Sequence, residues 1–213
     1  VGPAGGTDLE EMEAAPPEQR SARIRAAVDE TDEVLSIITA LLAVARIEGG
    51  NANPAFSPIA VDGWIESVAE LYRAAAEEDD RTLRVNASSS ATLSGDSVLL
   101  TQMLSNLLDN AILHTPRGTH VELATKRGED GVSIIVADSG PGVPEQEQAA
   151  ILRRFYRLDR SRHTPGAGLG LTLAAAIAEL HGAKFIVSDN KPGLKIEVRF
   201  PALPSACRTG EGA

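Results

Sequence analysis

The chain has 213 residues, of which 43% are apolar and only 3% aromatic, so its core is built mainly from aliphatic side chains. A net charge of −10 excludes general nucleic-acid binding, because neutralising phosphates needs a basic surface, and gives no reason to expect an anionic membrane as partner. The sequence has no apolar run of 18 residues and a single cysteine, Cys207. We therefore expect a cytoplasmic domain without membrane contact of its own, whether or not its parent protein is membrane-anchored.

The N-terminal quarter of the chain is predicted to be a linker and one long helix. Residues 1–17 are rich in Gly, Ala, Pro and Glu and indicate a flexible linker. From Glu18 to Glu48, apolar residues recur every three or four positions, and Gly49-Gly50 end the pattern. Such a helix would be about 45 Å long. It either packs on its own domain or forms an arm of a helical bundle, and its length favours the bundle.

The rest of the chain mixes helices with strands. The second predicted helix, Val61–Glu78, carries Trp64, Val68 and Leu71 on its apolar face, and Asp96 or Ser97 caps the third. Because the order is not a regular βαβ alternation, we expect an α+β fold, a two-layer sandwich with a mixed sheet behind a helical arm. The other predicted elements are the strands Thr82–Asn86, His120–Lys126, Val132–Ala137, Ala183–Ser188 and Leu194–Phe200 and the helices Ser97–Leu113 and Leu169–His181.

Two asparagines near the end of the third predicted helix form the first candidate motif. Asn106 and Asn110 are four residues apart, so both project from one helical face. An amide oxygen is a neutral, hard ligand that suits Mg²⁺ when waters and phosphates complete its coordination. Taken alone, two asparagines on a helix are more often surface or capping residues.

The second motif, Asp138-Ser-Gly-Pro-Gly-Val143, directly follows a predicted strand. A carboxylate at a strand end can accept a hydrogen bond from an exocyclic amine such as adenine N6. Gly140 and Gly142 would let the backbone approach a flat ring closely. Taken alone, such residues are more often an ordinary turn.

The third motif, residues 166–171, reads Gly-Ala-Gly-Leu-Gly-Leu and opens a predicted helix. Free backbone N–H groups and the helix dipole at such an N-terminus favour phosphate. The motif is not a Rossmann fingerprint, because no suitable βαβ unit surrounds it, and it lacks the Lys-Ser/Thr of a P-loop.

In this order and spacing, the three motifs resemble the N, G1 and G2 boxes of the GHKL ATP-binding superfamily, specifically those of sensor histidine kinases. Residues 104–116 are similar to the kinase N box, and residues 154–162 are similar to the F box of the mobile lid. Leu180-His-Gly-Ala183 takes the usual place at the end of the G2 helix. The long first helix is similar to the second helix of the kinase dimerisation bundle, so the resemblance covers residues 18–201.

The resemblance implies a Bergerat ATP-binding fold over residues 54–201, after a bundle helix at 18–50 and before a flexible tail at 202–213. It implies ATP and Mg²⁺ as cofactors, with Asn110 ligating Mg²⁺ and Asn106 supporting it. Arg157 of the lid would reach the terminal phosphate. The other implied nucleotide-binding residues are His114, Asp138, Gly140, Gly142 and Val143 around the base and Gly166, Ala167, Gly168, Leu169, Gly170 and Leu171 around the phosphates.

The identity of residue 106 bears on the implied reaction. ATPase members of the superfamily commonly carry a Glu four residues before the Mg²⁺-binding Asn, where it activates water. Asn106 has no useful basicity, which favours phosphotransfer to a protein over ATP hydrolysis. The resemblance thus implies transfer of the γ-phosphate to a bundle histidine and then to an aspartate of a response-regulator receiver domain. It also implies a homodimer formed through the bundle.

Two features depart from the family's pattern. The acceptor histidine of the first bundle helix is missing, because the four histidines all lie in the ATP-binding part: His114, His120, His163 and His181. We favour truncation between the bundle helices and expect a fragment that binds Mg-ATP but cannot autophosphorylate in cis. In addition, Leu113 stands where many relatives carry Lys or Arg. This could weaken contact with the γ-phosphate, or Arg117 or Arg157 could replace it.

Two other functions stay open. The chain could be a pseudokinase, meaning a non-catalytic nucleotide-binding or dimerisation module that regulates a partner. A protein serine kinase of the anti-sigma type is disfavoured, because that group lacks the long arm and usually carries Glu at position 106. We further predict contacts between copies along the stripe Ile24–Ala45 and least order in the lid, residues 144–165, without nucleotide.

Overall fold

The computed structural model of the chain describes residues 56–78, 80–153, 156 and 169–203. The expected linker and bundle helix with its apolar stripe, half of the lid, and the tail beyond 203 lie outside the described residues. Arg157 and Gly166–Gly168 lie outside them too. None of the described helices is long and apolar enough to cross a membrane.

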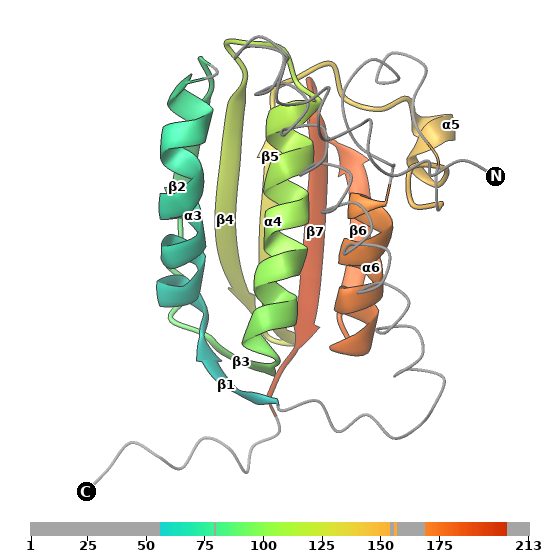
Figure 1. The fold of residues 1–213 in the computed structure, drawn as a ribbon. Coiled ribbons are helices and arrows are strands. Elements are labelled where there is room, and N and C mark those ends of the chain that lie inside the picture. Colours follow the sequence, from blue (N-terminus) through green and yellow to red (C-terminus); the bar gives the residue numbers. More distant parts are fainter. Residues whose placement is uncertain (1–55, 79, 154–155, 157–168, 204–213) are drawn as a thin grey trace, which may run out of the picture.

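The described residues form an α+β fold whose three longer helices cover one face of a five-stranded sheet (Figure 1). The elements in chain order are β1 (Ser57–Ala60), α3 (Val61–Glu78), β2 (Thr82–Asn86), β3 (Thr92–Gly95), α4 (Ser97–Leu113), β4 (His120–Gly128), β5 (Gly131–Asp138), α5 (Glu145–Gln148), α6 (Gly170–Leu180), β6 (Lys184–Asp189) and β7 (Leu194–Pro201).

The sheet is mixed, as expected, with the strand order β2-β4-β5-β7-β6. Only β2 and β4 run parallel, and the other neighbours are antiparallel. Alternate residues along β4, β5 and β7 face the helices, which explains why Leu123, Ile134 and Val198 are fully buried. Strand β5 lies at the centre of the sheet, and its last residue is Asp138.

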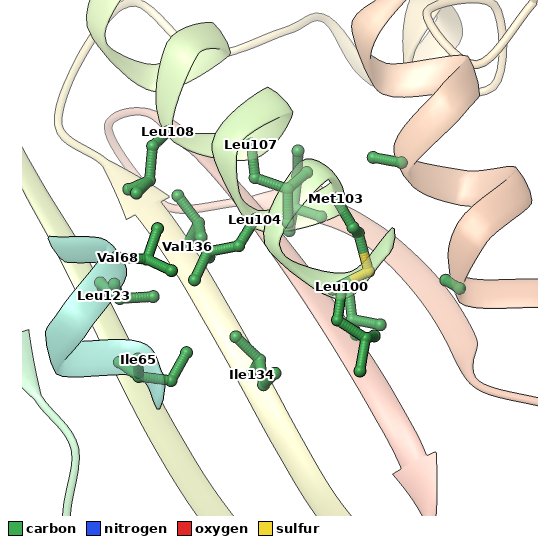
Figure 2. Close-up of a cluster of buried hydrophobic side chains, with 14 of the residues drawn as sticks. Ile65, Val68, Leu100, Met103, Leu104, Leu107, Leu108, Leu123, Ile134 and Val136 are labelled. Atoms are coloured by element: carbon green, nitrogen blue, oxygen red, sulfur yellow. The ribbon is translucent and has the colours of Figure 1, made fainter. Parts of the chain in front are cut away.

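Helix α4 lies in the middle of the helical layer, between α3 and α6 (Figure 1). Its side chains Leu100, Met103, Leu104, Leu107 and Leu108 are fully buried, and Figure 2 shows them gathered over the sheet. The side-chain oxygen of Asp96 accepts hydrogen bonds from the N–H groups of Val98 and Leu99, so Asp96 is the N-cap. Packing and capping together fix the helix that carries the two motif asparagines.

The structure differs from the sequence-based expectation at several elements. Strand β1 lies directly before α3, where no strand was predicted, and pairs with β3 in a second, two-stranded sheet. Leu71 is 74% exposed and does not belong to the buried face of α3. The buried face of α3 is formed instead by Val61, Ile65, Val68, Ala69 and Ala76. Strands β4 and β5 also extend further than expected, to a two-residue turn at Glu129-Asp130.

Candidate functional site

The polar face of α4 meets the start of α6. Asn106 is half-buried, and its Nδ2 atom is buried without a hydrogen-bond partner among the described residues. A Cβ placed on Gly170, the first residue of α6, would lie 3.7 Å from Asn106 Oδ1. A buried amide without a partner costs free energy unless a ligand or water satisfies it. This arrangement therefore fits a polar ligand between α4 and the N-terminus of α6.

Asp138 stands at the end of the central strand and begins a turn, residues 138–142, that we call the Asp138 turn. Its side chain is only 5% exposed. Oδ1 accepts hydrogen bonds from the backbone N–H groups of Gly140 (2.8 Å) and Leu194 (3.3 Å). Two donors on one oxygen fix the orientation of the carboxylate, which is what recognition of a directional donor requires.

The C-terminal end of α4 contacts the Asp138 turn. Thr115 is buried, and its hydroxyl donates to the Ala111 carbonyl at 2.6 Å. The Thr115 methyl lies so close to Gly140 that a Cβ on the glycine would be 2.8 Å away. Next to it, the backbone N–H of Ser139 donates to the His120 carbonyl at 2.9 Å. The end of the N-box helix and the start of β4 thus hold the turn from one side.

A segment that sequence reasoning did not assign to the site holds the Asp138 turn from the other side. Residues 190–193, which we call the β6–β7 turn, place the Asn190 amide 2.8 Å from the Asp138 carbonyl oxygen. Gly193 has a φ of +116°, and a Cβ there would overlap that same oxygen. A Cβ on Gly142 would lie 2.6 Å from the Gly193 carbonyl oxygen. The sequence signal here, Asn-Lys-Pro-Gly, indicated only a hairpin.

The N-terminus of α6 carries the described part of the third motif. Leu169 is buried and precedes the helix, and Leu171 is half-buried against the core. The helix begins at Gly170, so N–H groups of its first turn have no intrahelical acceptor and concentrate positive potential there. The other glycines of the motif lie outside the described residues.

The C-terminus of α6 is anchored to the start of α4 through His181. Its Nε2 atom accepts a hydrogen bond from the Asp96 N–H (3.0 Å), while Nδ1 lies 2.7 Å from the Ile177 carbonyl. The ring of Phe56 stacks on it with centroids 4.7 Å apart. Burial lowers the pKa of His181, although the Ile177 carbonyl and Asp96 act in the opposite direction. His181 is therefore a neutral, structural residue.

Asp109 lies inside the N box but faces α3 instead of α6. Its side chain accepts a hydrogen bond from Tyr72, whose hydroxyl also lies 3.4 Å from the Ser105 carbonyl. Burial raises the pKa of Asp109, and the hydrogen bond from Tyr72 offsets part of that effect. Burial, together with the nearby Asp109, raises the pKa of Tyr72 to about 12. Asp109 thus belongs to the α3–α4 interface.

The remaining expected residues lie around these three elements. Asn110 is half-buried on the same face of α4 as Asn106, and its carbonyl accepts the His114 N–H at 3.2 Å. His114 caps α4 and is exposed. Val143 is half-buried against the core just after the Asp138 turn.

The described residues fit a Mg-nucleotide. The buried, unsatisfied amide of Asn106 and the fixed carboxylate of Asp138 supply polar contacts at two separate points. A Cβ on Gly140 would lie 2.9 Å from Asp138 Oδ1, so the turn closely adjoins that carboxylate. Among the described residues, no group of three or more His, Cys, Asp or Glu could hold a metal ion. A cation here would therefore need phosphate oxygens to complete its coordination, with Asn110 as the protein ligand.

Comparison with known proteins agrees with this geometry. Residues 95–204 match the family described as histidine kinase-, DNA gyrase B- and HSP90-like ATPase. The sensor-like histidine kinase SenX3 of Mycobacterium tuberculosis is 31% identical over 185 residues, which are 85% of this chain and 45% of SenX3. The sensor protein IrlS of Burkholderia pseudomallei is 32% identical over 183 residues, or 84% of this chain and 39% of IrlS. The chain spans less than half the length of these curated relatives.

Solved structures show the same fold. The mycobacterial sensor histidine kinase MprB superposes with a TM-score of 0.63 at 28% identity, covering 70% of this chain and 99% of that one. Full-length ShkA, solved in complex with AMPPNP, gives a TM-score of 0.69 at 26% identity over 89% of this chain and 41% of ShkA.

Proposed function

This chain belongs to the histidine kinase-, DNA gyrase B- and HSP90-like ATPase family, as the catalytic ATP-binding domain of a sensor histidine kinase, and on that premise we propose the reaction it performs. It transfers the γ-phosphate of ATP to a histidine on a helical bundle, from which an aspartate of a response-regulator receiver domain receives it. In this proposal the acceptor histidine lies on the first helix of that bundle. By the resemblance, residues 18–50 are expected to be the second helix of that bundle and to bring two copies together.

One observation carries the proposal: the Asn106 side chain lies beside the N-terminus of α6, and its buried Nδ2 atom has no partner among the described residues. This places an unsatisfied amide next to backbone N–H groups that favour phosphate. Asn110 follows on the same helical face, where its amide oxygen would ligate Mg²⁺. The phosphates are thus bound between two helices that also pack against each other.

The base is read at the other end of the site. The Asp138 carboxylate, oriented by the N–H groups of Gly140 and Leu194, accepts a hydrogen bond from the adenine 6-amino group. Gly142 and Val143 would lie along the base, and His114 would contact it from the end of α4. Because Asp138 is almost fully buried, this hydrogen bond forms away from water, where it is stronger.

The chemistry requires positioning and charge neutralisation more than covalent help from the protein. Bound Mg²⁺ supplies neutralisation of phosphate charge. Asn106 and the first turn of α6 would orient the phosphates, and the resemblance implies that Arg157 and residues 166–168 would contact them as well. Since Asn106 cannot act as a base toward water, the bound phosphate is transferred to the histidine that the bundle presents and is not hydrolysed.

Phosphotransfer in trans tests the proposal. The chain is incubated with radiolabelled ATP, Mg²⁺ and a separately prepared two-helix bundle that carries an acceptor histidine, and acid-labile, base-stable phosphohistidine is counted. We expect labelling of the bundle that falls more than about tenfold in Asn110→Ala. A matched control, Asn86→Ala at the exposed end of β2, should label the bundle as the unaltered chain does.

Two results would contradict the proposed reaction. Labelling that is equal in the unaltered chain and in Asn110→Ala would contradict the assignment of the metal site to α4. Nucleotide binding without any phosphohistidine, with several bundles tried, would instead favour the non-catalytic module.

A further inference from the structure

At the end of the β5–β7 ladder, side chains replace backbone groups as hydrogen-bond partners. The last ladder pair is Ala137 opposite Lys195, so Leu194 lies next to Asp138 one step further on. A strand N–H ordinarily donates to a backbone carbonyl across the ladder. Here the Leu194 N–H donates to the Asp138 side chain, at 3.3 Å from Oδ1, and the Asp138 carbonyl accepts from the Asn190 side chain at 2.8 Å.

This exchange depends on the shape of the β6–β7 turn. The Asn190 N–H donates to the Gly193 carbonyl at 3.0 Å and closes the turn, which directs the Asn190 amide back toward Asp138. Gly193 passes so close to the Asp138 carbonyl that no side chain fits there. Without the Asn190 amide, that carbonyl would lose its side-chain donor, and the ladder register sets the Leu194 N–H opposite Asp138 as the backbone donor that would replace it.

We propose that Asn190 is a positioning residue for adenine recognition: it occupies the Asp138 carbonyl, keeps the Leu194 N–H on the Asp138 carboxylate, and so aims that carboxylate at the 6-amino group of the base. The inference rests on the proposed function only in taking Asp138 as the residue that reads adenine. Asn190 is 52 residues from Asp138 in sequence and contacts its backbone, so its effect on the nucleotide is indirect.

The test compares two ligands that differ only at the 6-position. The full chain and its variants are titrated calorimetrically with ADP and with purine riboside 5′-diphosphate, which lacks the 6-amino group. Asn190→Ala removes the amide. Asn190→Asp removes the donor but keeps a residue that favours turns, so one variant should fold even if the other does not. Lys191→Ala, at an exposed residue of the same turn, is the matched control.

We expect the unaltered chain and Lys191→Ala to bind ADP more tightly than the analogue. Both Asn190 variants should bind ADP about five- to tenfold more weakly, with binding of the analogue unchanged within about twofold. A purely structural role would weaken both ligands equally, and that result would overturn the inference, as would unchanged binding of ADP.

Asp138→Asn separates this inference from the proposed function. In this variant the N–H groups of Gly140 and Leu194 would keep their hydrogen bonds, now to the amide oxygen of the new asparagine. Its NH₂ group would then face the 6-amino group of adenine, so the preference for ADP over the analogue is lost. If Asp138→Asn loses the preference and the Asn190 variants keep it, only the role of Asn190 is wrong. If the unaltered chain shows no preference for ADP, the assignment of Asp138 fails and the inference fails with it.

Discussion

At the scale of single residues, the site depends on the close contacts that hold Asp138 in one orientation. Asp138 is buried, its carboxylate is held by two backbone N–H groups, and its carbonyl is covered by Asn190 and Gly193. The proposed recognition of adenine by Asp138 requires a carboxylate that is held this way, because a mobile carboxylate would lose orientation and gain little from its hydrogen bond.

Gly193→Ala should lower the free energy of unfolding by at least about 2 kcal/mol, because the new Cβ combines a φ of +116° with overlap of the Asp138 carbonyl. Gly118→Ala is the comparison: its φ is +79°, but a Cβ there has nothing within 4 Å. Urea unfolding of both variants measures the difference. Equal losses would mean that the close approach at Asp138 contributes nothing.

At the scale of elements, sequence periodicity predicted helices well where one face is buried throughout. The bounds of α3, β2 and α4 agree with the expected ranges, because caps and regular apolar spacing mark them. Leu71 was assigned to the wrong face of α3, since an isolated apolar residue near a buried stripe does not show in which direction around the helix axis its side chain points. Strands β1 and β3 were missed because each has four residues and finds its partner far along the chain.

Gly63→Ala tests whether the backbone freedom that glycine loses on folding lowers the stability of α3. Gly63 lies inside the helix, is exposed, and a Cβ there would meet nothing within 4 Å. We expect the free energy of unfolding to rise by about 0.5–1 kcal/mol, because alanine loses less backbone freedom than glycine on folding. Gly95→Ala provides the contrast: its Cβ would lie 2.5 Å from Leu100, so stability should fall. A loss of stability in Gly63→Ala would contradict the described course of α3.

The junction between α6 and α4 should make stability depend on pH. Burial lowers the pKa of His181 in the folded chain, so the unfolded chain takes up a proton below about pH 6.5 that the folded chain does not. Stability from this residue is therefore present above pH 6.5 and is lost as the pH falls toward the folded pKa. Unfolding free energies between about pH 7.5 and 5.5 should decline less in His181→Gln than in the unaltered chain.

The control for this dependence is Asn86→Ala, which alters an exposed residue without a titratable side chain. Its free energy of unfolding should decline with pH as that of the unaltered chain does. If the free energies of unfolding of His181→Gln and of the unaltered chain decline in parallel, the hydrogen bond that the Asp96 N–H donates does not require a neutral imidazole.

At the scale of the whole molecule, the motifs identified the family but not the full set of residues that hold them. The α+β class and the mixed sheet could be predicted from the order of helices and strands, and the kinship with sensor histidine kinases from three spaced motifs. The roles of Asn190 and Thr115 could not, since each acts through a contact between segments distant in sequence. The expected roles of Arg157, Gly166–Gly168 and the bundle helix stay predictions.

Calorimetric titration with AMPPNP, with and without Mg²⁺, tests the central claim most directly, that α4, the Asp138 turn and α6 form one Mg-nucleotide site. We expect the unaltered chain to bind at about micromolar concentration with Mg²⁺ and more weakly without it. Asp138→Asn should weaken binding in both conditions, whereas Asn110→Ala should remove only the Mg²⁺-dependent gain. A folded chain that releases no heat, or an Asn110→Ala variant that keeps the full gain from Mg²⁺, would contradict the account.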